Sequence, residues 1–164
     1  MLQSGVANKL IMLIIILFLS GITLVQADTL EQADDLNALA KTIRAQNKPL
    51  MLMFSAKHCE YCQRLREEQL LPILKDRAYD DLVIVREFKM DEAGYVQNFD
   101  GKQISYEDFA ELYAIDVTPT VIFLDDKGRL LARNIVGYSN PYFYSAYMDN
   151  LIQTANRKLR RYEH

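Results

Sequence analysis

The distribution of apolar and polar positions predicts alternating helices and strands along most of the chain. Apolar residues recur every three or four positions from Leu30 to Ile43, the spacing of an amphipathic helix, and Thr29 with Gln32 resembles a capping box at its start. The short continuous apolar run at residues 50–55 is typical of a buried strand. A second strand is predicted farther along, where β-branched residues are frequent and alternation is partial, at residues 82–88.

The second half of the chain predicts a helix, a hairpin of two strands and a final helix. Ser105 is a start signal for the first of these helices. Residues 121–124 and 130–136 flank a short turn that contains glycine, which favours an antiparallel hairpin. Asn140 and Pro141 supply an N-cap and a first-turn proline for the last helix. We expect the tyrosines in and before this helix to pack in the core rather than bind a ligand: Tyr138, Tyr142, Tyr144 and Tyr147.

Taken in order, the predicted elements are αβαβαββα, which indicates an α/β fold with a four-stranded mixed sheet. A right-handed helical crossover joins the first two strands, and helices cover both faces of the sheet. Pro72 is expected to kink or restart the helix that precedes the second strand. The polar segment 91–104, with its Asp100-Gly101 turn signal, is expected to form a long loop or a short hairpin.

The first 27 residues differ in composition from the rest. Lys9 is followed by an uninterrupted apolar run from Leu10 to Leu19, and Val25-Gln26-Ala27 fits a signal peptidase site. We therefore expect residues 1–27 to be an export signal and residues 28–164 to form one globular domain. The apolar stretch is shorter than the roughly 20 residues that span a bilayer as a helix, and a retained membrane anchor is the alternative.

Charge and composition exclude several classes of function. The 164 residues carry a formal net charge of −3, and no basic stripe is present that could bind the phosphates of nucleic acid. The chain has two cysteines and two histidines, and one of the histidines is the terminal His164. Because a zinc site needs four well-spaced ligands, we expect no metal site. No cofactor is expected either.

The cysteine pair is the feature most informative about chemistry. Cys59 and Cys62 stand three positions apart, between the predicted strand at residues 50–55 and the helix that follows it. A disulfide stabilises chiefly by restricting the unfolded chain, and the gain is small when so short a loop is closed. The pair therefore favours electron exchange over a structural role.

Two segments together resemble the thioredoxin superfamily. They are residues 54–62, which place a CxxC motif at a helix start, and the Val117-Thr118-Pro119-Thr120 loop. Residues 98–105, with the helix and strand after them, are further similar to exported thioredoxin-like reductases of the SoxW type. The similarity spans about residues 30–155. It implies the thioredoxin fold and a thiol:disulfide oxidoreductase activity.

The resemblance implies roles for particular residues. Cys59 is expected to be the nucleophile, which agrees with the stabilisation of a thiolate by the N-terminus of a helix. Cys62 is expected to resolve the mixed disulfide. A cis peptide is expected between Thr118 and Pro119, with the proline against the sulfurs and the Thr118 backbone free to pair with an extended substrate.

Three departures from the common thioredoxin pattern bear on redox tuning. Met53 stands where cytoplasmic thioredoxins carry a buried carboxylate, so that role is vacant or is filled by water or another group. His58 replaces a tryptophan, and Glu60-Tyr61 replaces glycine-proline. A protonated His58 stabilises the Cys59 thiolate, whereas Glu60 opposes its ionisation. The sequence therefore does not show whether the two together favour or oppose the thiolate. The alternative for His58 is a solvated turn residue.

These inferences converge on an exported, monomeric thiol:disulfide oxidoreductase that reduces the disulfides of client proteins. Because no flavin or nicotinamide site is predicted, its electrons must come from another protein. By resemblance, that donor is a membrane thiol transporter of the CcdA or SoxV type. The alternatives are a disulfide oxidant or isomerase, and a non-catalytic thioredoxin-fold adaptor or chaperone.

Overall fold

A four-stranded mixed sheet forms the centre of the molecule in the computed structural model, which describes residues 29–162. The expected export signal lies outside the described residues. The strands are β1 (Leu50–Ser55), β2 (Ile84–Lys89), β5 (Thr120–Leu124) and β6 (Ile135–Val136). They lie in the order β2-β1-β5-β6, with β1 parallel to β2 and antiparallel to β5. The predicted α/β class and the four-stranded mixed sheet are confirmed.

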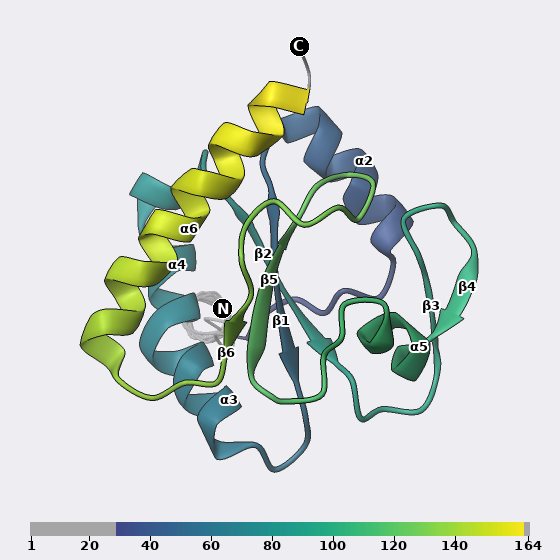
Figure 1. The fold of residues 1–164 in the computed structure, drawn as a ribbon, viewed down its shortest axis with the longest axis horizontal. Coiled ribbons are helices and arrows are strands. Elements are labelled where there is room, and N and C mark those ends of the chain that lie inside the picture. Colours follow the sequence, from purple (N-terminus) through teal and green to yellow (C-terminus); the bar gives the residue numbers. More distant parts are fainter. Residues whose placement is uncertain (1–28, 163–164) are drawn as a thin grey trace, which may run out of the picture.

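Helices cover both faces of this sheet, as predicted. They are α2 (Leu36–Gln46), α3 (Glu60–Leu65), α4 (Leu71–Lys75), α5 (Tyr106–Glu111) and α6 (Pro141–Tyr162), with a 3-10 turn η2 (Arg77–Tyr79). In Figure 1, α3, α4 and α6 lie on one side of the sheet and α2 and α5 on the other. Within residues 29–162, none of these helices has the length and apolar character needed to cross a membrane.

The helix after β1 changes geometry along its length. Between α3 and α4 the chain forms a π-helical turn, η1 (Arg66–Leu70), and Pro72 lies in the first turn of α4. Proline lacks a backbone N–H and is tolerated at a helix start. The predicted restart at Pro72 is therefore confirmed, and the π-turn that precedes it was not expected.

The polar segment before α5 forms a short hairpin. It consists of β3 (Tyr95–Gln97) and β4 (Gln103–Ser105), which pair antiparallel and are separate from the main sheet. Gly101 has a φ of 78° in the connecting turn, which glycine adopts without steric cost. The hairpin alternative is thus the one the chain adopts.

The first helix begins later than the capping pattern at Thr29 predicts. It starts after Asp35, whose carboxylate accepts a backbone N–H of the first turn at 2.8 Å. The preceding segment is extended instead and pairs with β2. The backbone N–H of Ala33 donates to the Glu87 carbonyl at 2.8 Å, and the Glu87 N–H donates to the Glu31 carbonyl at 2.9 Å. Pairing with the open edge of β2 outweighs the local helical pattern.

The predicted strand at residues 130–136 is wrong over most of its length. Only β6 pairs regularly with β5, and Leu130 forms an isolated bridge with Leu124. Between these two pairings the chain has two more residues than the facing part of β5, so it bulges out of the ladder. The apolar pattern of a single strand does not reveal such a mismatch.

The core packs against both faces of β1, which is buried along its whole length. On one face, the rings of Phe54, Phe88 and Phe109 form a cluster with centroids 4.9–5.9 Å apart. Near the other face, Tyr138 and Tyr144 are buried with their rings 4.8 Å apart. The prediction of core packing is wrong for the other two tyrosines, which are exposed on the outer side of α6: Tyr142 and Tyr147.

Candidate active site

The two cysteines lie where the chain turns from β1 into α3. Cys59 is the N-cap residue of α3, and its Sγ accepts the backbone N–H of Cys62 at 3.1 Å. The two sulfurs are joined in a disulfide with a Cα–Cα distance of 5.2 Å. Cys59 is partly exposed, whereas Cys62 is only 1% exposed. The site therefore presents Cys59 to the solvent and keeps Cys62 behind it.

The loop before β5 contacts the disulfide. Its Thr118–Pro119 peptide is cis, as the resemblance implies. The Thr118 hydroxyl donates to Cys59 Sγ at 3.6 Å, which brings together two segments 59 residues apart. The backbone N–H of Gly137 donates to the Pro119 carbonyl at 2.8 Å and holds the loop against β6. The structure thus assembles the four residues expected to form the site.

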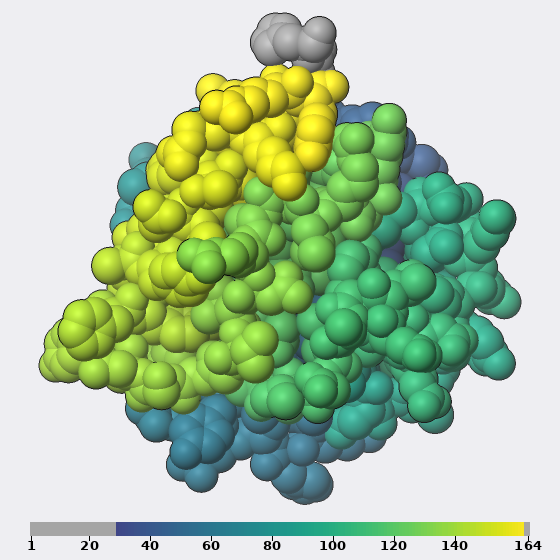
Figure 2. Space-filling view, viewed as in Figure 1, coloured from purple at the N-terminus to yellow at the C-terminus, as the bar shows by residue number. Residues whose placement is uncertain are grey.

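The surface around the disulfide is open to a polypeptide. Neither the N–H nor the C=O of Thr118 bonds to the backbone of another described residue. Tyr61, Val117 and Val136 expose apolar side chains beside it. In Figure 2, the start of α3 meets the segments around β5 and β6 at the lower edge of the molecule. An extended chain can add its own backbone hydrogen bonds to such an unpaired stretch.

The turn before Cys59 is anchored from the end of β2. His58 has a left-handed backbone with a φ of 56°, and the N–H of Lys57 donates to Asp91 Oδ2 at 2.7 Å. The side chains of the three predicted tuning residues are exposed: His58, Glu60 and Tyr61. Because water screens charges at the surface, any effect of these residues on the Cys59 thiolate is weakened. Their tuning role remains a prediction.

A buried carboxylate that the sequence analysis missed lies beneath this helix. Glu87 on β2 is 2% exposed and is in register with Met53, the position where a carboxylate was expected to be absent. It accepts hydrogen bonds from the Ser55 hydroxyl at 2.6 Å, from Arg66 Nε and Nη2 at 3.2 and 2.5 Å, and from Gln32 Nε2 at 3.3 Å. The sequence shows a glutamate inside the predicted second strand, but only the register of β2 against β1 shows that it is buried.

A second polar network ties the same helix to α6. The Tyr138 hydroxyl donates to Glu68 at 2.6 Å and accepts from Gln69 at 3.2 Å, and the Ser145 hydroxyl donates to Gln69 at 2.6 Å. The hydrogen bonds from Tyr138 and from Arg64 lower the pKa of Glu68. Burial and the hydrogen bond to Glu68 raise the pKa of Tyr138. This network holds the helix in place behind the cysteines.

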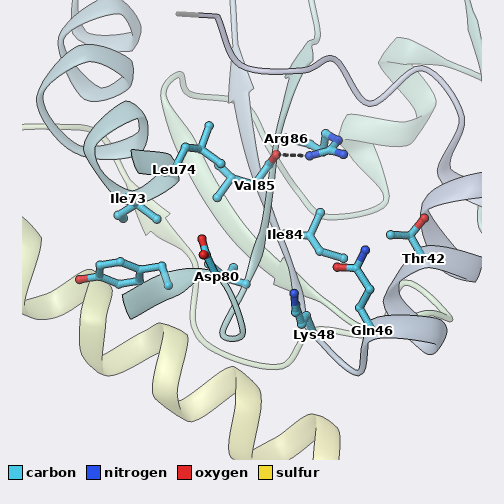
Figure 3. A pocket seen from close by; sticks show the side chains of 11 residues that line it. Thr42, Gln46, Lys48, Ile73, Leu74, Asp80, Ile84, Val85 and Arg86 are labelled. Atoms are coloured by element: carbon cyan, nitrogen blue, oxygen red, sulfur yellow. Dashed lines mark hydrogen bonds between the residues drawn. The ribbon is translucent and has the colours of Figure 1, made fainter. Parts of the chain in front are cut away.

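The cavity shown in Figure 3 is separate from the cysteines. It lies at the amino ends of β1 and β2, where Lys48, Ile84 and Arg86 are among the lining residues, and it encloses about 210 Å³. Small-molecule sites usually enclose about 300–1,000 Å³. In the part of the chain that the structure describes, no group of three histidine, cysteine or acidic side chains could hold a metal ion.

Comparison with known families shows which family the chain belongs to. The sequence profile of the thioredoxin-like domain matches residues 36–152, a range that contains both cysteines and the cis-proline loop. The chain belongs to the thioredoxin-like domain family. No curated protein sequence matches it significantly. A thioredoxin-like domain whose CxxC cysteines form a disulfide supports thiol:disulfide oxidoreductase activity.

Solved thioredoxin structures share this fold over most of their length. Oxidised mitochondrial thioredoxin 3 from Saccharomyces cerevisiae is 23% identical, with 74% of this chain and 95% of that chain covered at a TM-score of 0.52. Thioredoxin from Malassezia sympodialis is 18% identical, with 80% and 98% covered at a TM-score of 0.54. Oxidised thioredoxin O2 from Arabidopsis thaliana is 16% identical, with 77% and 97% covered at 0.53. At these identities the likeness shows the fold alone.

Proposed function

We propose that this protein is an exported thiol:disulfide oxidoreductase that reduces the disulfides of other proteins. One observation carries the proposal: Cys59 caps a helix, is partly exposed, and forms a disulfide with the buried Cys62 opposite a cis-proline loop. A purely structural disulfide gains little from spanning two residues and gains nothing from exposure. In a redox role, the short spacing lets Cys62 reach Cys59, and the exposure lets a client disulfide reach Cys59.

The reaction is an exchange of disulfide bonds in two steps. In the reduced protein, the Cys59 thiolate attacks one sulfur of a client disulfide, and the other client sulfur leaves as a thiolate. The Cys62 thiolate then attacks Cys59 Sγ, forms the disulfide seen in the structure, and releases the second client sulfur. Two electrons pass from the cysteine pair to the client.

The local geometry favours the first step. The backbone N–H of Cys62 donates to Cys59 Sγ at 3.1 Å, and the positive end of the helix dipole lies at the same place. Both stabilise the anionic form of Cys59 in the reduced protein, which is the form that attacks. A hydrogen bond from the Thr118 hydroxyl adds to this stabilisation.

Client binding is assigned to the Thr118 backbone and the apolar side chains around it. An extended client segment can pair with the free N–H and C=O of Thr118, which places its disulfide beside Cys59. Tyr61 and Val136 contact the flanking residues of the client. Because the backbone supplies the hydrogen bonds, this mode accepts many different client sequences.

Export and the electron donor are proposed from the sequence. The apolar segment at residues 10–19 supports delivery to an oxidising compartment, where client disulfides form. Each turnover leaves the protein oxidised, so a donor must reduce it again. The similarity to SoxW-type reductases supports a membrane thiol transporter of the CcdA or SoxV type in that role.

Insulin reduction by dithiothreitol tests the exchange activity. The protein is expected to accelerate the precipitation of insulin chains, and Cys59→Ala is expected to abolish the acceleration. Ser139→Ala, a change at an exposed residue outside the site, is the matched control and should retain the wild-type rate. Equal rates for wild type and Cys59→Ala would leave the non-catalytic adaptor or chaperone as the better assignment.

A redox titration of the cysteine pair tests the direction of electron flow. A reduction potential near the roughly −270 mV of thioredoxin supports the reductase. A value near the roughly −120 mV of a strong oxidant would overturn it in favour of the oxidant or isomerase.

A further inference from the structure

We infer that a groove between α5 and the end of β2 binds a basic segment of the client protein. The inference deepens the proposed exchange function and depends on it, because it adds a preference among clients to the backbone pairing at Thr118. This groove, called the α5 groove below, encloses about 510 Å³. Its lining includes three apolar and three acidic residues: Met90, Ala110, Ile115, Glu107, Glu111 and Asp116.

The α5 groove lies at the edge of the sheet that carries the cysteines. Met90 directly follows β2, and its backbone N–H donates to the carbonyl of Ser55, the last residue of β1, at 3.0 Å. On the other side, Asp116 stands two residues before Thr118, whose hydroxyl donates to Cys59 Sγ. Figure 1 shows α5 beside the carboxyl end of β2. A client segment that pairs with Thr118 therefore has the groove next to it.

The apolar part of the groove lies deeper than the acidic part. Ala110 and Ile115 are buried, and Met90 is half-buried. The three acidic residues are all exposed. The groove thus offers an apolar surface with carboxylates around it, and it suits a side chain that is itself apolar along its stem and charged at its tip.

The three carboxylates have no cation to balance them. Within residues 29–162, none of Glu107, Glu111 and Asp116 forms an ion pair or accepts a side-chain hydrogen bond. Glu107 and Glu111 are four positions apart on α5, where like charges repel each other. Glu111 is also the last residue of α5, where the negative end of the helix dipole opposes an anion. A cation bound in the groove relieves both unfavourable contacts.

The other charges near the groove do not supply that cation. Lys89 is turned toward Glu92, with 3.9 Å between the nitrogen and the oxygen. Lys57 is exposed, and its backbone N–H donates to Asp91, which adds a further anion beside Met90. Among the described residues that line the groove, no lysine or arginine is present.

Charge and shape together specify the occupant as a client segment that carries lysine or arginine. The aliphatic stem of such a side chain covers Met90 and Ile115, and its charged end reaches the carboxylates of α5. An acidic segment would instead meet three like charges. Complementary charges of this kind select partners and speed their association more than they tighten the final complex.

Quenched-flow measurement of disulfide reduction by the reduced full-length protein tests the preference. Three peptides, each closed by one disulfide, differ only in the residues next to their cysteines, which are lysine, glutamine or glutamate. The rate of each with dithiothreitol corrects for its intrinsic reactivity. At low salt we expect the corrected second-order rate constant to be about tenfold higher for the lysine peptide than for the glutamate peptide, the sum of a few exposed ion pairs. In 1 M sodium chloride, where the screening length is about 3 Å, the difference should fall below about twofold.

Variants with altered charge show where the preference arises. Glu111→Lys is expected to reduce the ratio of the lysine rate to the glutamate rate to less than about threefold, and Glu107→Gln/Glu111→Gln to about threefold. Asp80→Lys is the matched control, because it makes the same change in net charge at an exposed residue near the amino end of β2, and it should keep the wild-type ratio. Each variant should reduce hydroxyethyl disulfide, a small neutral substrate, at the wild-type rate, since the groove lies away from the sulfurs.

The outcomes separate the inference from the proposed function. Equal corrected rates for the three peptides, or an equal fall in the ratio for Glu111→Lys and Asp80→Lys, would overturn the role of the groove while the exchange activity stands. Self-association of the protein by light scattering, lost in Glu111→Lys, would assign the groove to a second copy and would also overturn the inference. Failure of the wild-type protein to reduce any of the peptides would instead overturn the proposed function.

Discussion

Two buried carboxylates within residues 29–162 are each bonded to an arginine, yet they serve different ends of the sheet. Asp125 follows β5 at the end far from the cysteines and is fully buried. It accepts the N–H groups of Lys127 and Arg129 at 2.9 and 2.8 Å and the Arg129 Nε at 2.5 Å. All its partners belong to its own turn. Glu87, in contrast, is bonded by side chains 21 to 55 residues away.

The difference shows that burial of a charge does not by itself mark a functional residue. Asp125 organises a local turn through bonds to residues two and four positions away. Glu87 joins the helix that carries the cysteines to the sheet. The partners of each carboxylate, rather than its exposure, indicate what it does.

The largest expected effect on stability comes from removing the local carboxylate. Asp125→Ala leaves two backbone N–H groups and the Arg129 side chain without their acceptor. Because Arg129 is partly exposed, we expect a loss at the low end of the range for broken buried pairs, about 3 kcal/mol in the free energy of unfolding. Urea unfolding of the oxidised protein at pH 7 measures it.

The same variant sharpens the contrast between the two ends. Under conditions where Asp125→Ala is folded, it should reduce insulin at the wild-type rate. Cys62 should also resolve the mixed disulfide at Cys59 at the wild-type rate. A stability loss below about 1 kcal/mol, or an altered exchange rate in the folded protein, would show that the two carboxylates are not separate in their roles.

Two glycines provide a smaller comparison between the ends. Gly128 has a φ of 75° in the Asp125 turn, and an added Cβ would lie 2.7 Å from a Phe99 ring carbon and 2.9 Å from the Tyr113 hydroxyl. Gly137, beside the cis-proline loop, has a φ of 76° but open space around the same position. Alanine pays the left-handed backbone cost of about 1–2 kcal/mol at both sites and meets a steric clash only at Gly128.

We therefore expect Gly128→Ala to destabilise the protein by about 2 kcal/mol and Gly137→Ala by about 1 kcal/mol. Urea unfolding of the two variants under identical conditions measures the difference. Equal losses in the free energy of unfolding would mean that the turn near Asp125 accommodates an added methyl group as easily as the open surface beside the cysteines.

The smallest expected effect concerns pH and the network behind the cysteines. A lowered pKa in the folded protein means that ionised Glu68 stabilises the fold above its unfolded value of about 4.3. This contribution is lost as the pH falls through the folded pKa. The stability difference between wild type and Glu68→Gln should therefore be greatest near pH 7 and shrink as the pH falls below about 4.3. Urea midpoints at several pH values measure it, and a difference that grows in acid would contradict the assignment.

Local signals explain why much of the site could be predicted from the sequence. The helix start at Cys59 and the proline after Thr118 are each encoded within a few residues. Ser105 and Asn140 likewise cap their helices through their own side chains. Such features depend little on the rest of the fold.

The features that were missed depend on partners distant in the sequence. The extended segment at Ala33 follows from an open edge of β2, and the bulge before β6 follows from the length of β5 that it faces. The position of Glu87 opposite Met53 requires the register of two strands. No local pattern around Glu87 distinguishes it from a solvent-facing residue of a half-buried strand.

Trapping of a mixed disulfide tests the central claim, nucleophilic attack by Cys59, most directly. In Cys62→Ala the first exchange step survives and the second is lost, so client proteins should remain bound to Cys59. The measurement is non-reducing electrophoresis of cell-envelope proteins followed by mass spectrometry of the linked peptides. We predict adducts joined at Cys59 that dithiothreitol releases and that are absent from Cys59→Ala/Cys62→Ala. Absence of any Cys59 adduct would contradict the account.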